Sequence, residues 1–183
     1  MHRVQRAAIV TRLARKMREK GSWCGETHLQ KAFYLAQELL KVPTGFDFIL
    51  YKHGPFSFDL RDELTALRAD RLLTIEPQPR PFGPRFATTK RSEEIESLFP
   101  KTIGGLDAKL DFIADKLQGK GVADLERLAT ALYVINHYDF CTALDDRAAK
   151  LNELKPHVSL TDAKSALEQV AEFATQAQKF LPA

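Results

Sequence analysis

The chain has 183 residues, of which 44% are hydrophobic and 28% charged, and its formal net charge is +3. This length suits one well-cored domain, and no apolar run approaches the roughly 18 residues that a membrane span needs. Arginines interrupt the apolar residues near the N-terminus, so a secretory signal is not expected, and the two cysteines form no disulfide framework. We therefore expect one cytoplasmic domain over residues 1–183.

The first segment is strongly basic. Residues 1–20 contain seven basic residues and one acidic residue, a net charge of +6, so the rest of the chain sums to −3. Apolar residues at helical spacing predict a helix from about Arg6 to Lys20. The opposite face of this helix is basic, and we expect it to be mainly solvated. Its residues are Arg12, Arg15, Lys16 and Arg18.

A second helix is predicted from about Glu26 to Lys41, where Pro43 and Gly45 end it. We expect its apolar stripe to face the core and its polar positions to face outward. Those outward positions are Gln30, Lys31, Tyr34, Gln37 and Glu38. The aromatic and branched residues of Phe46–Tyr51 then indicate a strand, and His53-Gly54-Pro55 is typical of a turn.

The next segment has the layout of a winged helix. A third helix is predicted from Ser57 or Asp59, both good N-cap residues, to about Asp70–Arg71. The elements that follow are a strand at Leu72–Glu76, a proline-rich loop at Gln78–Pro84, a strand at Arg85–Thr88 and a helix at Ser92–Phe99. This order favours a winged-helix fold, which serves both DNA binding and protein binding.

Four further apolar stripes predict a helical back half. They cover Leu106–Leu117, Val122–Ile135, Leu144–Leu154 and Leu160–Ala177. The predicted fold class is therefore mainly α with a small β hairpin, in which a winged-helix-like N-terminal half, residues 1–100, packs on a C-terminal helical bundle, residues 101–183. The best candidate for a seam between these halves is Lys101–Gly105, which is too short to separate them.

No pattern of residues indicates a catalytic centre. A GxSxG motif is absent, and Gly104-Gly105 lacks the flanking pattern of a phosphate-binding loop. The paired carboxylates Asp145-Asp146 and Glu93-Glu94 point about 100° apart on a helix and do not converge. Cys24 and His28 have no second pair with which to ligate zinc. We therefore expect no catalytic, cofactor-binding or metal-binding residues, and no enzyme.

The densest cluster of unusual residues is the segment Tyr51–Asp59. It holds three aromatic residues, a histidine and a Gly-Pro pair. In one interpretation Gly54-Pro55 shapes a corner while Phe56 and Phe58 fill the core. In the other, the corner exposes aromatic side chains that anchor a partner protein. The candidate partner-binding residues are Tyr51, His53, Gly54, Pro55, Phe56 and Phe58.

Two segments, LQKAFYLAQELL (Leu29–Leu40) and YKHGPFSFDLRDELTAL (Tyr51–Leu67), resemble YwgA-like proteins and the related Panacea, or SocA-like, antitoxin domain. Those families have an L-Q-K-x-x-Y-L-A-Q helix followed by a Y-G-P turn that opens the next helix. The spacing Tyr-Lys-His-Gly-Pro is nearer to the YwgA-like pattern, because an aromatic residue stands directly before Gly-Pro in the main Panacea pattern. The segments Leu125–Val134 and Lys155–Leu167 also look YwgA-like.

The resemblance implies a mostly helical fold without catalysis. Panacea domains neutralise partner toxins by direct binding, and a SocA-like member acts as an adaptor that hands its toxin to a AAA+ protease. By this resemblance the chain is expected to be a non-catalytic protein-binding module, antitoxin-like or proteolytic-adaptor-like. Its partner would be a toxin or protease machinery.

The alternative interpretation is a winged-helix DNA-binding transcriptional regulator. Its candidate phosphate-binding residues are Arg12, Arg15, Lys16, Arg80, Arg85, Lys90 and Arg91. The third helix, which would enter the DNA groove, carries nearly equal numbers of acidic and basic residues. A neutral helix gives up the phosphate contacts that supply most non-specific affinity, so this interpretation ranks second.

Overall fold

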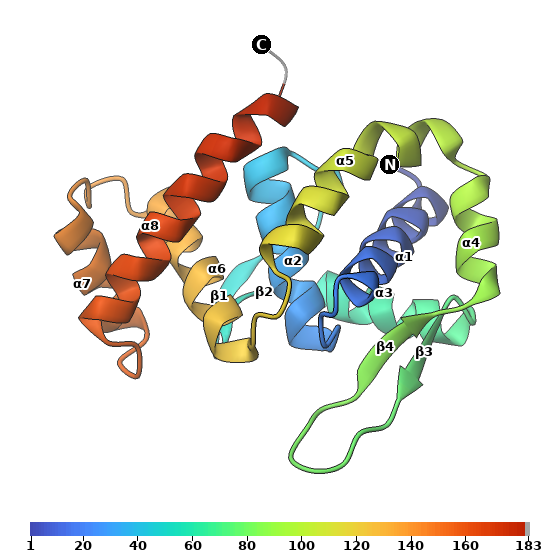
Figure 1. The fold of residues 1–183 in the computed structure, drawn as a ribbon, viewed down its shortest axis with the longest axis horizontal. Helices are drawn as coiled ribbons and strands as arrows, with labels where there is room; N and C mark the ends of the chain where they lie inside the picture. The colour runs from blue at the N-terminus through green and yellow to red at the C-terminus, as the bar shows by residue number, and fades with distance from the viewer. Residues whose placement is uncertain (182–183) are drawn as a thin grey trace.

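The computed structural model in Figure 1 describes residues 1–181 and has eight α-helices and two small antiparallel hairpins in that part of the chain. It confirms the predicted fold class, mainly α with little β structure. The front elements are α1 (Arg3–Glu19), α2 (Glu26–Leu40), β1 (Ile49–Tyr51), β2 (Gly54–Phe56), α3 (Phe58–Ala69), β3 (Leu73–Glu76), β4 (Arg85–Thr88) and α4 (Lys90–Ser97). The remaining elements are α5 (Pro100–Lys116), α6 (Val122–His137), α7 (Leu144–Leu154), α8 (Leu160–Ala177) and a short 3-10 turn, Gln178–Phe180.

Helix α1 is buried on more than its apolar face, so the expected solvation of its basic residues is wrong. Arg12 Nε lies 2.7 Å from Asp107 Oδ1, and Arg15 pairs with Glu96. Lys16 is buried, with its Nζ 2.7 Å from Asp111 Oδ1. These acidic partners belong to α4 and α5, which pack against α1 and neutralise its charge.

Helix α2 lies at the centre of the molecule, between α5 on one side and α6 on the other (Figure 1). Elements therefore cover it on most sides, and polar residues that periodicity places outside are buried. Gln30, Lys31 and Tyr34 are each at most 1% exposed, which contradicts the predicted outward orientation. Only Gln37 and Glu38 of the expected polar face remain partly exposed.

The first hairpin differs from the predicted strand and turn. Only Ile49–Tyr51 of the expected strand is extended in a sheet, and it pairs with Gly54–Phe56. The turn is at Lys52-His53, so Gly54 and Pro55 are strand residues instead of the turn itself. Ser57 caps α3 by accepting a hydrogen bond from the Leu60 amide, as its residue type predicts.

The second hairpin is the wing. Strands β3 and β4 pair from Leu73↔Thr88 to Glu76↔Arg85, and the loop between them projects beyond the helices (Figure 1). Three helices followed by this hairpin give the order expected of a winged helix.

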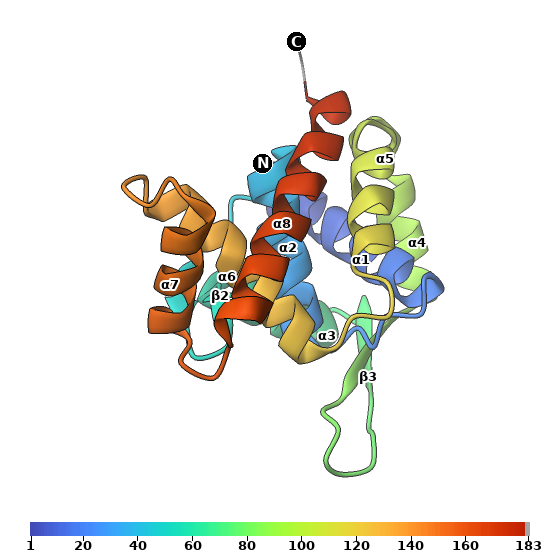
Figure 2. The same cartoon turned by 60° about the vertical axis from the view of Figure 1, so that its left-hand side comes forward.

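Helices α6, α7 and α8 pack together as predicted for the back half, whereas α5, which was expected in the same bundle, packs on the front elements; Figure 2 shows α8 crossing over α2 and α6, with α7 alongside. The proposed seam Lys101–Gly105 is wrong, because these residues, Gly104 and Gly105 included, lie inside α5. Helix α5 packs on α1 and α2, and one apolar core runs from α1 to α8. Among the described helices, none combines the length and the apolar character that crossing a membrane requires.

Candidate functional site

Three aromatic side chains gather on the surface where the first hairpin meets α3. The ring centroids of Tyr51, Phe56 and Phe58 lie 5.2–5.8 Å apart in all three pairs. Tyr51 is 53% exposed and Phe58 41%, while Phe56 is partly buried between them. The neighbouring Ile49 is 49% exposed. We call Tyr51, Phe56 and Phe58 the aromatic corner; because Phe58 is exposed, it does not fill the core.

Gly54 and Pro55 lie beneath this corner and are buried. Gly54 has φ +82°, and a Cβ atom added there would lie 2.9 Å from Thr130 Oγ1 of α6. Only glycine allows both this left-handed backbone and this close approach. The hairpin is thereby seated directly on α6.

Helix α2 holds the other end of the corner through hydrogen bonds to the backbone. Gln30 Nε2 donates to the Ser57 carbonyl at 2.9 Å, and the Ser57 amide donates to Gln30 Oε1 at 2.8 Å. Lys31 Nζ donates to the Pro55 carbonyl at 3.0 Å. Both side chains are buried, so these bonds fix the backbone between β2 and α3 in a site shielded from water.

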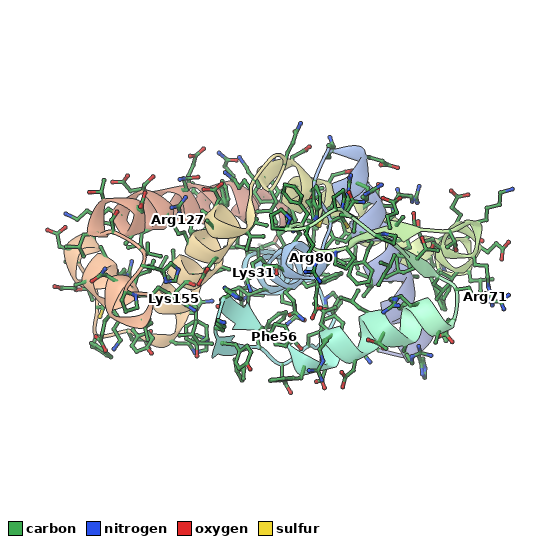
Figure 3. The ribbon with its side chains drawn as sticks, turned by 90° about the horizontal axis from the view of Figure 1, so that it is seen from below. Lys31, Phe56, Arg71, Arg80, Arg127 and Lys155 are labelled. Atoms are coloured by element: carbon green, nitrogen blue, oxygen red, sulfur yellow. The ribbon has the colours of Figure 1, made fainter. Side chains whose placement is uncertain are left out.

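A buried ion pair completes the support of the hairpin. Lys155 Nζ lies 3.2 Å from Glu126 Oε1 and donates to the carbonyls of Tyr51 and Lys52 at 2.8 and 2.5 Å. Both charged side chains are about 6% exposed. We call Lys31, Glu126 and Lys155 the lysine–glutamate clamp. Figure 3 views it from below, with Lys31, Lys155 and Phe56 placed around the hairpin.

Two histidines flank the clamp on its exposed side. His53 Nδ1 lies 3.7 Å from Glu126 Oε2, and His157 Nε2 lies 3.5 Å from Glu126 Oε1. Their side chains are 57% and 62% exposed. His53, one of the predicted partner-binding residues, therefore lies beside the aromatic corner and next to the buried carboxylate. In residues 1–181 no group of three or more His, Cys, Asp or Glu side chains is arranged to hold a metal ion.

Burial changes the ionisation of the groups packed around α2. It lowers the pKa of Lys31 to about 8, although the nearby Glu126 carboxylate opposes this shift. Burial also raises the pKa of the Tyr34 hydroxyl, and it raises the pKa of the Cys24 thiol to about 12. The thiol and the phenol are therefore neutral at physiological pH.

The residues of the clamp were absent from the predicted site. Periodicity assigns a polar residue on an amphipathic helix to solvent, which is why Lys31 and Glu126 escape detection. All three residues of the clamp, and the hairpin turn that it holds, lie in the four segments in which a family resemblance was noted: Leu29–Leu40, Tyr51–Leu67, Leu125–Val134 and Lys155–Leu167.

Four of the seven candidate nucleic-acid-binding residues are engaged in contacts within the protein. Arg12, Arg15 and Lys16 pair with acidic residues of α4 and α5, as described above. Arg85 lies 5.0 Å from the Trp23 ring and donates to the Trp23 carbonyl. The three left exposed, without an ion pair to any described residue, are Arg80, Lys90 and Arg91.

Comparison with known proteins gives no further assignment for this surface. No protein-family model matches the sequence, and no curated protein matches it either. The geometry of the corner and the chemistry of its residues therefore carry the functional argument.

Proposed function

We propose that this protein is a non-catalytic protein-binding module, antitoxin-like or adaptor-like, whose aromatic corner contacts the partner. The observation that carries the proposal is the exposure of Tyr51 and Phe58 on a backbone that α2 and α6 hold from beneath. Large aromatic side chains contribute most of the binding energy at protein interfaces when they fill a pocket of the partner. An exposed aromatic cluster on a folded domain is suited to that role.

The rigidity of the corner supports the same proposal. Binding loses free energy when it must order flexible side chains or loops, and a surface that is already ordered avoids that loss. Here the aromatic rings contact one another, and the clamp fixes the backbone carbonyls of Tyr51, Lys52 and Pro55. The partner therefore meets a surface already in its binding conformation.

The resemblance to YwgA-like and Panacea sequences supplies the antitoxin-like part of the proposal. Its four segments meet at the aromatic corner and its clamp. If that arrangement is shared, the segments are alike because they build one binding surface. A toxin, or a protease component that receives one, is the class of partner that this reasoning favours.

Affinity purification from the source cells tests the proposal. The wild-type chain should retain a stoichiometric partner, and a Tyr51→Ser/Phe58→Ser variant should lose it while keeping its circular dichroism spectrum. Phe140→Ser is the matched control, because Phe140 is 76% exposed and packs on Tyr138, outside the corner. Equal recovery of the partner with the double variant and with the wild type would contradict the proposal.

A DNA-binding regulator remains the second proposal, and the wing carries it. Arg80 on the wing loop and Lys90 and Arg91 at the start of α4 are exposed. Phosphate contacts weaken steeply with salt, so a gel shift should be run from about 50 mM salt upward. The protein-binding proposal expects no shift at the lowest salt. A shift that Arg80→Glu abolishes would favour the DNA-binding proposal instead.

A further inference from the structure

A groove runs beside the wing loop, over the first turns of α2 and α6. Two adjoining depressions of about 420 and 440 Å³ form it, and Trp23, His28, Gly83 and Val122 line both of them. One face of α3 forms one wall, through Arg61, Leu64, Thr65 and Arg68. These four residues follow the i, i+3, i+4, i+7 spacing of a single helix face. We call this feature the wing groove.

The floor of the wing groove is apolar and ordered. The Trp23 ring lies 5.1 Å from the Phe82 ring, and its indole N–H donates to the Gly83 carbonyl at 3.2 Å. Phe82 is 60% exposed and Val122 44%. The groove therefore offers apolar surface that the chain itself leaves in water, next to a tryptophan already fixed in position.

The rim of the groove is cationic. Arg61, Arg68 and Lys120 line it, against the single carboxylate of Glu26. Arg61 pairs with Asp62 at 2.9 Å, whereas neither Arg68 nor Lys120 forms an ion pair with any residue in 1–181. Helices α2 and α6 also begin at the groove, and the partial positive charge of a helix N-terminus adds to the same sign.

We propose that the wing groove binds an acidic segment of a partner protein that carries a bulky apolar side chain. The apolar side chain would lie against Trp23 and Phe82, while carboxylates on either side reach Arg68 and Lys120. Nucleic acid would meet the same cations, but interfaces with nucleic acid are more polar than this floor. The groove meets the aromatic corner at Arg61, whose guanidinium lies 5.0 Å from the Phe58 ring, but none of the three corner residues lines the groove. This inference therefore does not require that the corner binds a partner.

Trp23 is the only tryptophan in the chain, so its fluorescence reports on the groove alone. The experiment selects binders of the full-length protein from a randomised twelve-residue peptide library without tryptophan. We expect the enriched peptides to combine Asp or Glu with Phe or Leu and to change Trp23 emission. An Arg68→Glu/Lys120→Glu variant should bind them about tenfold more weakly, as expected for removal of two charge pairs. An Arg91→Glu variant, which changes an exposed cation outside the groove, should bind them normally.

Several results would overturn the proposal. Enrichment of basic or uncharged peptides, no enrichment at all, or binders that leave Trp23 emission unchanged would each do so. Tighter binding of oligothymidine than of any peptide, with the same emission change, would assign the groove to single-stranded nucleic acid. Peptides that bind without an effect on Trp23 but lose binding in the Tyr51→Ser/Phe58→Ser variant would support the aromatic corner and not the groove.

Discussion

The aromatic corner requires a glycine at position 54, both for its backbone conformation and for its packing on α6. In Gly54→Ala the new Cβ atom would lie too close to Thr130 Oγ1, and the alanine would have to adopt a left-handed backbone conformation. We therefore expect a loss of about 2 kcal/mol or more in unfolding free energy. Gly45→Ala is the matched control, because Gly45 has φ +68° and no atom within 4 Å of the added Cβ. It should lose only about 1 kcal/mol. Equal losses in urea denaturation would show that the contact with Thr130 is unimportant.

The buried Lys31 makes the free energy of unfolding rise with pH, because burial lowers the pKa of its ammonium group. Its pKa is about 8 in the folded state and about 10.5 when exposed. Below pH 8 Lys31 is protonated in both the folded and the unfolded state, and the folded protein bears the full cost of the buried charge. Between these values the folded state loses the proton while the unfolded state keeps it, so this residue's contribution to stability rises with pH.

A comparison with Lys31→Met isolates that contribution. The stability of the wild type, relative to the variant, should increase between about pH 7.5 and pH 9.5 in guanidinium denaturation. Groups outside the clamp titrate alike in the two proteins, so their effects cancel. A difference that stays constant over this range would mean that Lys31 is solvated enough to keep its ordinary pKa.

Most elements could be predicted from periodicity and capping residues, while the orientation of polar side chains could not. The bounds of α3, β4 and α7 follow closely from Ser57, the wing pattern and Pro156. The apolar face of α2 was predicted, but the burial of its polar residues was not, because α5 and α6, which are far from it in sequence, and the first hairpin cover them. The location of the aromatic corner was predicted, but its exposure depends on how Gly54-Pro55 seats the hairpin on α6.

The first hairpin is too short to hold its own position, so we attribute its stability to the clamp. Two strands of three residues are marginal in water, and here Lys155 and Glu126 hold them from beneath. Glu126→Gln removes the ion-pair partner of the buried Lys155 and a carboxylate that favours the charged form of the buried Lys31, and we expect a loss of about 3 kcal/mol or more in unfolding free energy. Adding Lys155→Met should restore part of it, because the second change removes one uncompensated charge.

The control for the clamp is an ion pair on the surface. Lys164 Nζ lies 2.6 Å from Asp145 Oδ1, but both side chains are largely exposed. Asp145→Asn should leave the denaturation midpoint almost unchanged, because exposed pairs contribute little. If Glu126→Gln behaved like this control, the clamp would have no structural role.

The residues that the structure describes share one core, and the central position of α2 links the front elements to α6–α8. Helix α2 packs on α5, and it also packs on α6 and α8. We therefore expect a single cooperative transition on thermal unfolding. Trp23 fluorescence reports on the front half, and far-UV circular dichroism reports on helices of both halves, so the midpoints of the two signals should coincide. Separate midpoints for the two signals would mean that α6–α8 unfold independently of the winged-helix-like half.

At the scale of the whole molecule, we propose that a rigid helical scaffold presents the aromatic corner to a partner protein. Site-specific photo-crosslinking in the source cells tests it most directly, with a photoreactive phenylalanine placed in turn at Tyr51, Phe58 and Phe140. We expect one crosslinked protein of defined mass from Tyr51 and Phe58, and none from Phe140. Crosslinks of equal yield from all three positions, or from Phe140 alone, would show that the aromatic corner is not the binding surface.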